Sequence, residues 1–297
     1  MRRTSILALA LWLVLVPLAP RGDAQGRAAK TRLRAMTFNV RYDFEDDGPN
    51  RWPHRKETVA KVIRESQAWV VGLQEDKGEQ VDDLRPLLPG WEFLGRGRNQ
   101  GGSGERCSIL VHREHVRVRD AGDFWLSDTP DVEGSNTWGD RYPRKVTWAA
   151  LEVKRSRTTV LVLNTHLPEG TGKNHALRVR GARLMREWIA ARTARDRERL
   201  AVVVLGDFNA GADDEPRTAL AGEGADALLR DAWTEAAPND PSPGTYNDFR
   251  GLRTQQRIDW ILIGGPIRAV AAAKLDQQVD GRWPSDHYPV LADLELR

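Results

Sequence analysis

The feature that most constrains the fold is a series of short apolar runs spread along almost the whole chain. Most of the runs are five to eight residues long and rich in Val, Ile and Leu, which is typical of strands buried on both faces. They predict strands at residues 33–40, 69–73, 108–111, 146–153, 158–163, 200–205 and 258–263. Apolar residues at helical spacing after Pro53 and across residues 176–195 predict helices between them, so the chain belongs to the α/β class.

The first 24 residues are predicted to be a secretory signal peptide. Arg2 and Arg3 precede an apolar run at residues 6–18, and small residues follow up to Ala24, which is the layout of such a leader. The run is shorter than the about 20 residues of a membrane-spanning helix, although an uncleaved anchor is the alternative. We therefore expect residues 25–297 to form one domain of a secreted or periplasmic protein, with no integral membrane segment after cleavage.

Cysteine content excludes internal disulfides and thiolate metal clusters, and the charge argues against a duplex DNA nuclease. Cys107 is the only cysteine, so the chain cannot form an internal disulfide or a thiolate metal cluster, and its apolar neighbours predict a buried strand residue. The formal net charge is +3, and the leader supplies most of it. Without a basic stripe, the remainder lacks the charge from which a duplex DNA nuclease gains affinity.

Polar side chains follow four of the predicted strands. Glu75 follows the run at 69–73, His166 follows the run that ends at Leu163, and Asp207 and Asn209 follow the run at 200–205. Asn39 lies at the end of its own strand. Because ligands of α/β sheets gather beyond the carboxyl ends of the strands, we expect these side chains to meet at one rim.

Three further polar residues lie at the beginning of their predicted strands or just before them, rather than after them. Asp259 lies at the start of its apolar run, and Asp286 and His287 come just before the apolar residues 288–291. To reach the same rim, these strands must run in the opposite direction. The sequence therefore predicts mixed sheets rather than parallel ones.

The residue types indicate a metal-assisted reaction. Carboxylate and amide oxygens without cysteine suit Mg²⁺, Mn²⁺ or Ca²⁺ better than zinc, and hydrolysis of a phosphate ester needs such a cation together with an acid or base that titrates near neutral pH. Asp259 is placed to fix the tautomer of His287. Taken singly, an Asp or Asn after a strand is more often a turn residue or a helix cap, so the prediction depends on the joint pattern.

Six segments of the chain together resemble the endonuclease/exonuclease/phosphatase superfamily, which includes DNase I-like nucleases, inositol-phosphate phosphatases and bacterial sphingomyelinases. They occur in the family's order at residues 37–41 (TFNVR), 71–75 (VGLQE), 164–167 (NTHL), 206–209 (GDFN), 257–260 (RIDW) and 285–290 (SDHYPV). The resemblance implies a four-layer α/β/β/α sandwich, in which two mixed β-sheets pack face to face and helices cover their outer faces.

The resemblance also implies a role for each residue around the metal and the phosphate. Glu75 would be the principal metal ligand, with Asn39 nearby and Asp286 assisting. Asp207 and Asn209 would place the attacking water and the phosphate, and Asn39 would share in phosphate binding.

Further roles concern the two imidazoles and their neighbours. His287 would pair with Asp259, and His166 would contact the phosphate or act as a second acid or base. Glu105 resembles the carboxylate that orients the first His of the family, and Arg144 resembles a phosphate-contacting Arg. Whether His287 or Asp207 takes the proton of the water stays open, as do the number and identity of the metal ions.

The substrate is set by loops, and two long predicted loops lie at residues 95–105 and 127–143. Residues 124–144 resemble a bacterial branch of the superfamily that is not tied to one substrate. We expect a monomer that acts on a small phosphorylated metabolite of the sugar or inositol phosphate type. The alternative is an exported nuclease or other phosphodiesterase with nucleic acid as its partner. A binding protein that lost catalysis would show damage in a motif, and none is damaged.

Overall fold

The computed structural model describes residues 31–195, 200–241 and 243–297, and the predicted signal peptide lies outside these residues. In the described chain, two six-stranded sheets carry the strand orders β11-β12-β1-β2-β4-β3 and β5-β6-β7-β8-β10-β9. We call them the first and the second sheet. A search of the described residues for helices long and apolar enough to cross a membrane finds none.

Both sheets are mixed. The strands of the first sheet are β1 (Arg32–Asn39), β2 (Val70–Gln74), β3 (Trp91–Leu94), β4 (Ile109–His112), β11 (Ile267–Lys274) and β12 (Val290–Leu296). Those of the second are β5 (Val116–Trp125), β6 (Lys145–Val153), β7 (Thr158–His166), β8 (Ala201–Asp207), β9 (Arg230–Asp231) and β10 (Asp259–Gly264). The pairs β1–β2 and β7–β8 are parallel, whereas β1–β12 and β8–β10 are antiparallel, which confirms the predicted strand directions.

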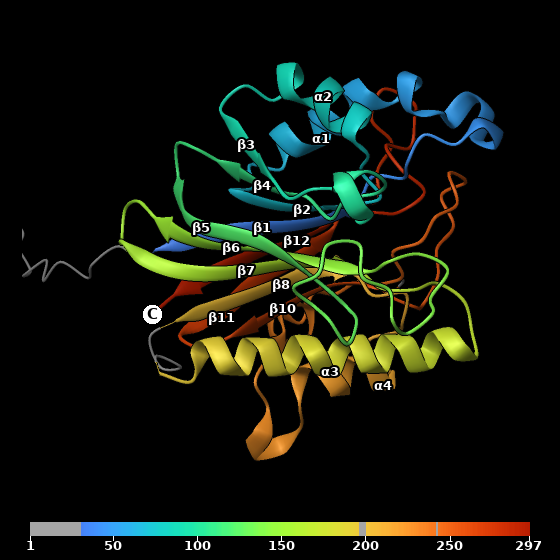
Figure 1. Cartoon of the computed structure of the whole chain (residues 1–297). Coiled ribbons are helices and arrows are strands. Elements are labelled where there is room, and N and C mark those ends of the chain that lie inside the picture. The colour runs from blue at the N-terminus through green and yellow to red at the C-terminus, as the bar shows by residue number, and fades with distance from the viewer. Residues whose placement is uncertain (1–30, 196–199, 242) are drawn as a thin grey trace, which may run out of the picture. The chain divides into compact units, whose positions relative to one another are not determined.

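Helices cover the outer faces of the sheets. Figure 1 shows α1 and α2 on one side of the sheets and α3 and α4 on the other. The helices are α1 (Lys56–Glu65), α2 (Gly78–Leu87), α3 (Lys173–Thr193), α4 (Glu215–Ala221) and α5 (Ala232–Ala236). Short 3-10 helices are η1 (Glu45–Asn50), η2 (Trp52–His54), η3 (Gln100–Gly102) and η4 (Gly224–Asp226).

The side chains of each strand point alternately to its two faces, and the core accordingly has three apolar layers. On β1, Leu33 and Ala35 belong to the layer between the sheets, whereas Met36 and Phe38 belong to the layer under α1 and α2. A third layer lies between the second sheet and α3. Because successive side chains of a strand point to opposite faces, both faces of each sheet are buried, and the predicted four-layer sandwich is confirmed.

Most predicted elements form near their predicted positions. The seven runs become β1, β2, β4, β6, β7, β8 and β10, and the helix after Pro53 begins at Lys56. The two long loops are present, with only η3 inside them among the regular elements. Cys107 is buried as predicted, but it precedes β4, which begins at Ile109, and burial raises the pKa of its thiol to about 12.

Candidate active site

The alternation that forms the inner core also places the first site residues. Asn39 follows Ala35 at even spacing on β1, and Asp207 follows Leu205 on β8, so both side chains enter the space between the sheets where the apolar layer stops. The Nδ2 atom of Asn39 donates to the Oδ2 atom of Asp207 over 3.0 Å. One hydrogen bond therefore joins the two sheets at their common rim.

A polar brace beneath this rim holds the sheets at a fixed spacing. The Gln74 amide donates to Oδ1 of Asn164 over 2.6 Å and to Thr37 over 3.0 Å, and Asn164 donates to the Leu73 carbonyl over 2.6 Å. Gly72 leaves room for the brace, because a Cβ there would lie 2.7 Å from the Asn164 Oδ1 atom. The brace orients β2 and β7, which carry Glu75 and His166 at their ends.

Glu75 accepts hydrogen bonds from the Asn39 amide at 3.0 Å and from the Tyr42 backbone N–H at 3.3 Å. Burial raises the pKa of this carboxyl, and the nearby charge of Asp286 raises it further. The guanidinium of Arg41 lies 3.9 Å from Glu75 and 3.8 Å from Asp286. Two carboxylates therefore face each other with one Arg side chain between them.

On the opposite side, His287 lies between two carboxylates. Its Nδ1 atom is 3.0 Å from Asp259 Oδ2, and its Nε2 atom is 3.8 Å from Asp207 Oδ2. Burial alone would lower the pKa of His287, but the charges of Asp259 and Asp207 outweigh it and raise this pKa well above its ordinary value. Burial, with Asp259 as the next cause, raises the pKa of Asp207 to about 7. The cluster thus holds an imidazolium beside a carboxyl that titrates near neutral pH.

The position of Asp259 depends on a loop that sequence reasoning missed. The backbone N–H groups of Ile258 and Asp259 donate to Thr245 Oγ1 over 3.1 and 3.2 Å. The next residue, Tyr246, forms an isolated β-bridge with His287, and the two rings meet edge to face at 5.3 Å. The loop has no strand or helix periodicity, so the sequence carried no signal for it.

His166 occupies the third side of the cluster. Its Nε2 atom lies 3.0 Å from the Asn209 amide and 3.5 Å from Asp207. Burial, followed by the charges of Arg144 and Arg98, lowers the pKa of His166 well below its ordinary value. The ring is therefore neutral, and its Nδ1 atom is buried without a hydrogen-bond partner.

Glu105 and Arg144 lie behind His166. Both line a small pocket together with it. The Glu105 carboxylate forms a two-bond pair with Arg98 at 2.9 and 3.0 Å, and no hydrogen bond joins it to His166 in the described chain. Arg144 pairs with Asp140 at 3.2 Å and donates to the His166 carbonyl oxygen at 3.4 Å. Both residues therefore lie next to the site. Neither the Glu105 carboxylate nor the Arg144 guanidinium forms a hydrogen bond with the His166 ring in the described chain.

The remaining predicted residues surround a cleft of about 420 Å³. Its predicted lining residues are Glu75, His166, Asp207, Asn209, Asp286 and His287. Asn39 and Asp259 do not line it but hold Glu75 and His287 from behind through the hydrogen bonds described above. Sequence reasoning missed Arg41, Glu169, Tyr246 and Gln256 in this lining.

The donor atoms of the cleft fit a divalent cation. Ligand atoms of Asp207, Asp259 and His287 all lie within 4.8 Å of one another, and Glu75 and Asp286 face them. The Oδ1 atom of Asp259 is buried without a partner. Burying several carboxylates is costly unless opposite charge accompanies them, and an oxygen-rich donor set is what hard divalent cations prefer. The carboxylate oxygens of this group could therefore hold a divalent metal ion.

Comparison with known families gives a match over most of the chain, because residues 36–287 fit the Endonuclease/Exonuclease/phosphatase family. The chain belongs to this family. The family and the structural neighbours are hydrolases of phosphate esters, so the predicted family and the predicted class of enzyme are both confirmed. A search of curated proteins finds no match to the sequence.

Three solved structures illustrate how similar endonuclease/exonuclease/phosphatase proteins are to this chain. A family protein of Bacteroides thetaiotaomicron is 26% identical, with a TM-score of 0.82 over 90% of this chain and 99% of that one. A mannosyl-6-phosphatase of the same organism is 27% identical, with a TM-score of 0.80 over 88% and 99%. A family protein of Bacteroides vulgatus is 30% identical, with a TM-score of 0.81 over 90% and 100%.

Proposed function

We propose that this phosphoesterase hydrolyses the phosphate monoester of a small sugar with the help of a divalent cation. The observation that carries the proposal is the position of His287, an imidazolium between Asp259 and Asp207, opposite the acidic pair of Glu75 and Asp286 across one cleft. The cleft volume of about 420 Å³ is at the small end of the range for ligand pockets. It suits one sugar ring and its phosphate.

The rim of the cleft supports a sugar as the group that carries the phosphate. Glu169, Thr254 and Gln256 line it, and their side chains exchange hydrogen bonds with hydroxyl groups. Tyr246, 38% exposed, adds an aromatic surface beside His287. A mannosyl-6-phosphatase is among the structural neighbours, which favours the same class of substrate for this chain.

In the proposed reaction, water attacks phosphorus in line with the sugar oxygen. The bond from the water oxygen to phosphorus forms while the bond from phosphorus to the sugar oxygen breaks, and the sugar oxygen takes up a proton from solvent as it leaves. Asp207, whose pKa is about 7, accepts the proton of the attacking water, since a general base works best when its pKa is near the working pH. The His287 imidazolium donates a hydrogen bond to a phosphate oxygen where negative charge develops. Neutral His166 and the Asn209 amide orient the phosphate.

The cation site is assigned to Glu75 and Asp286, with Asn39 supporting Glu75 through its amide. Mg²⁺ or Mn²⁺ suits these ligands, and Ca²⁺ is compatible with them. A cation held by these residues would offset negative charge on the phosphate and on the leaving oxygen. Arg41, which lies between the two carboxylates, compensates part of their charge when no cation is bound.

The test is phosphate release from mannose 6-phosphate, a simple phosphodiester and single-stranded DNA, with Mg²⁺ or Mn²⁺ and with a chelator. We expect the monoester to be cleaved fastest and the chelator to abolish cleavage. His287→Asn should lower the rate about 10²- to 10⁴-fold. The control is His175→Asn, a half-buried residue of α3 that does not line the cleft, and it should not change the rate. Faster cleavage of the diester would overturn the choice of substrate, and full turnover with the chelator would overturn the metal dependence.

We also propose that residues 1–24 are removed during export and that the mature protein acts as a monomer in the periplasm or outside the cell. The layout of the leader in the sequence supports this. N-terminal sequencing of protein recovered from its native cells should find a chain that begins near residue 25. A full-length chain in the cytoplasm would contradict the proposal, and light scattering would test the monomer.

A further inference from the structure

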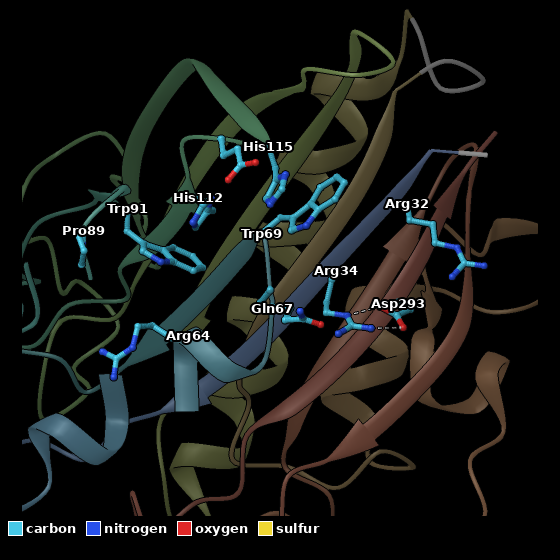
Figure 2. A pocket seen from close by; sticks show the side chains of 12 residues that line it. Arg32, Arg34, Arg64, Gln67, Trp69, Pro89, Trp91, His112, His115 and Asp293 are labelled. Atoms are coloured by element: carbon cyan, nitrogen blue, oxygen red, sulfur yellow. Dashed lines mark hydrogen bonds and ion pairs between the residues drawn. The ribbon is translucent and has the colours of Figure 1, made fainter. Parts of the chain in front are cut away.

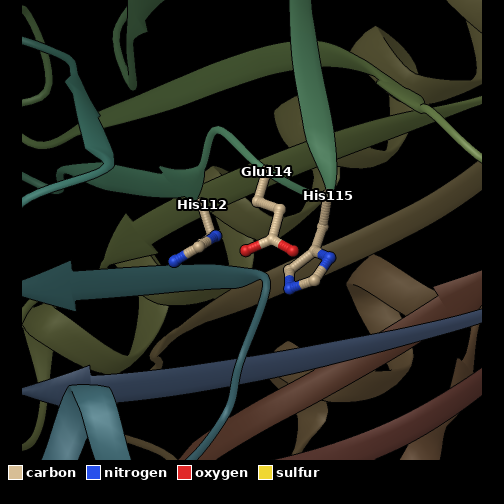
Figure 3. A group of neighbouring side chains, drawn as sticks. All are labelled: His112, Glu114 and His115. Atoms are coloured by element: carbon tan, nitrogen blue, oxygen red, sulfur yellow. The ribbon is translucent and has the colours of Figure 1, made fainter.

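A second group of metal-binding side chains lies at the other end of β2 from Glu75. His112 is the last residue of β4, Glu114 and His115 lie in the turn before β5, and the ligand atoms of all three lie within 4.8 Å of one another. The His115 backbone N–H donates to the His112 carbonyl over 3.0 Å, so the turn brings these two side chains together. Figure 3 shows the three side chains converging. Because β4 belongs to the first sheet and β5 to the second, this turn also joins the sheets.

Aromatic contacts fix the orientation of both imidazoles. Trp91 meets His112 edge to face at 5.1 Å, His112 stacks on His115 at 5.1 Å, and His115 stacks on Trp69 at 4.4 Å. Figure 2 shows the two His rings between the two Trp side chains. Preoriented ligands lose little freedom when they bind an ion, so the stack favours binding.

Two polar groups of this cluster, one on His112 and one on Glu114, form no hydrogen bond or ion pair in the described chain. The Nδ1 atom of His112 is buried and has no hydrogen-bond partner, although buried polar atoms are almost always paired. Glu114 is exposed and has no hydrogen bond or ion pair within the residues that the structure describes. Aromatic packing explains the positions of the rings but not the unpaired Nδ1 atom of His112. A bound cation would explain the ring positions and the unpaired nitrogen together.

The surrounding charges leave Glu114 available. Arg34 is paired with Asp293 through two bonds of 2.6 and 2.9 Å, and Arg113 lies 3.6 Å from Glu92.

We propose that His112, Glu114 and His115 bind a zinc ion. Two imidazoles and one carboxylate are a donor set that suits Zn²⁺, in contrast to the oxygen-rich cleft at the other end of the strands. Three protein ligands leave a position for water. A groove of about 570 Å³, which the three ligands line together with Trp69 and Trp91, gives the ion an entry path. The ion would hold the turn between the sheets and stabilise the fold rather than take part in hydrolysis.

The experiment measures zinc binding by calorimetry on chelator-treated protein, in a Glu75→Gln background that weakens binding at the cleft. We expect one strong equivalent of zinc. Adding Glu114→Gln or His115→Gln should weaken it by more than the roughly 10- to 100-fold that loss of a supporting residue costs, whereas adding His175→Gln should not. Co²⁺ in place of zinc should give the intense visible bands of a four-coordinate site, and these bands should be lost in the same variants.

Glu114 is exposed, so its substitution should leave the fold intact. The Glu114 variant therefore still tests the proposal if the His115 variant unfolds. Absence of strong zinc binding in the Glu75→Gln protein, or binding unchanged by Glu114→Gln, would overturn the proposal. Phosphate release by the single variant Glu114→Gln should equal that of the unaltered protein. Because zinc binding is measured without substrate, its outcome does not depend on the proposed phosphatase activity.

Discussion

The Nδ1 atom of His287 lies 3.0 Å from the Oδ2 atom of Asp259, and both side chains are buried. Asp259 is the first residue of β10, and His287 precedes β12, so each strand delivers one partner to the rim. This contact leaves the Nε2 atom of His287 facing Asp207 and the cleft. Asp259 therefore sets both the charge and the direction of the imidazole.

We predict that Asp259→Asn lowers the rate of phosphate release about 10²- to 10⁴-fold, because the imidazole loses its anchor and its positive charge. The pKa of His287 should fall, so the alkaline limb of the pH–rate profile should move to lower pH. Steady-state rates across the pH range would check this. A profile with an unmoved alkaline limb would show that Asp259 does not control His287.

Glu75→Gln separates the stability of the site from its activity. Removing a buried charge that faces Asp286 should raise the unfolding free energy of the metal-free protein by about 0.5–2 kcal/mol, as is common when an active-site residue is replaced. Phosphate release should fall at least about 10²-fold because the principal cation ligand is weakened. Urea unfolding with a chelator measures the first effect, and a loss of stability would contradict it.

The raised pKa of Asp207 predicts that metal-free protein loses stability as the pH rises. The folded state keeps a proton that the unfolded state has lost between about pH 4 and about pH 7, so the unfolding free energy falls across this window. One pKa unit corresponds to about 1.4 kcal/mol, which sets roughly 4 kcal/mol as the upper limit for this group. His287, whose pKa is also raised, extends the fall above about pH 6.5, whereas His166, whose pKa is lowered, opposes it below that value.

Asp207→Asn isolates this contribution. Urea unfolding with a chelator at several pH values should show a smaller fall of stability with pH in the variant than in the unaltered protein. Equal slopes for the two proteins would mean that Asp207 titrates at its ordinary pKa. Saturating Mg²⁺ should flatten the dependence of the unaltered protein, because a cation favours the ionised carboxylates.

Gly72→Ala tests the polar brace between the sheets. The added Cβ would lie 2.7 Å from Asn164 Oδ1, and displacing a packed side chain typically costs about 1–3 kcal/mol. Gly78→Ala is the matched control, since its Cβ would meet only the end of the Arg106 side chain at 3.7 Å. Denaturant unfolding should show a clear loss for the first variant and little change for the second. Equal unfolding free energies for the two variants would show that Asn164 can move aside without destabilising the protein.

Most strands buried on both faces were predictable from the sequence, whereas the edge strands β3, β5, β9 and β11 were not. β8 is buried along its whole length, so it reads as one apolar run. By contrast, residues 117–123 of β5 are all exposed or partly exposed, and β11 alternates between buried and partly exposed residues over its first half. β3 and β9 have only four and two residues. Short or half-exposed strands depend on the neighbour that pairs with them, and that neighbour is distant in sequence.

The buried position of Arg55 could not be predicted from its residue type. It is 1% exposed, and it donates to the carbonyl oxygens of Val40 and Pro284. It thereby ties the end of β1 to the segment that carries Asp286 and His287. Arg is rarely buried, so no local pattern could predict this contact.

The sequence by itself determined the chemistry of the donor groups and the strand ends on which they stand, because the two-residue period of a strand is a local property. Only the tertiary structure decided which donor meets which. Asn39 bonds to Asp207, 168 positions away, while Glu105 pairs with Arg98 instead of His166. The charge states of Asp207 and His287 follow from burial, from their distances to Asp259 and from the distance between them. His287 meets the two aspartates, which are paired in the second sheet, only when the segment before β12 of the first sheet packs against them.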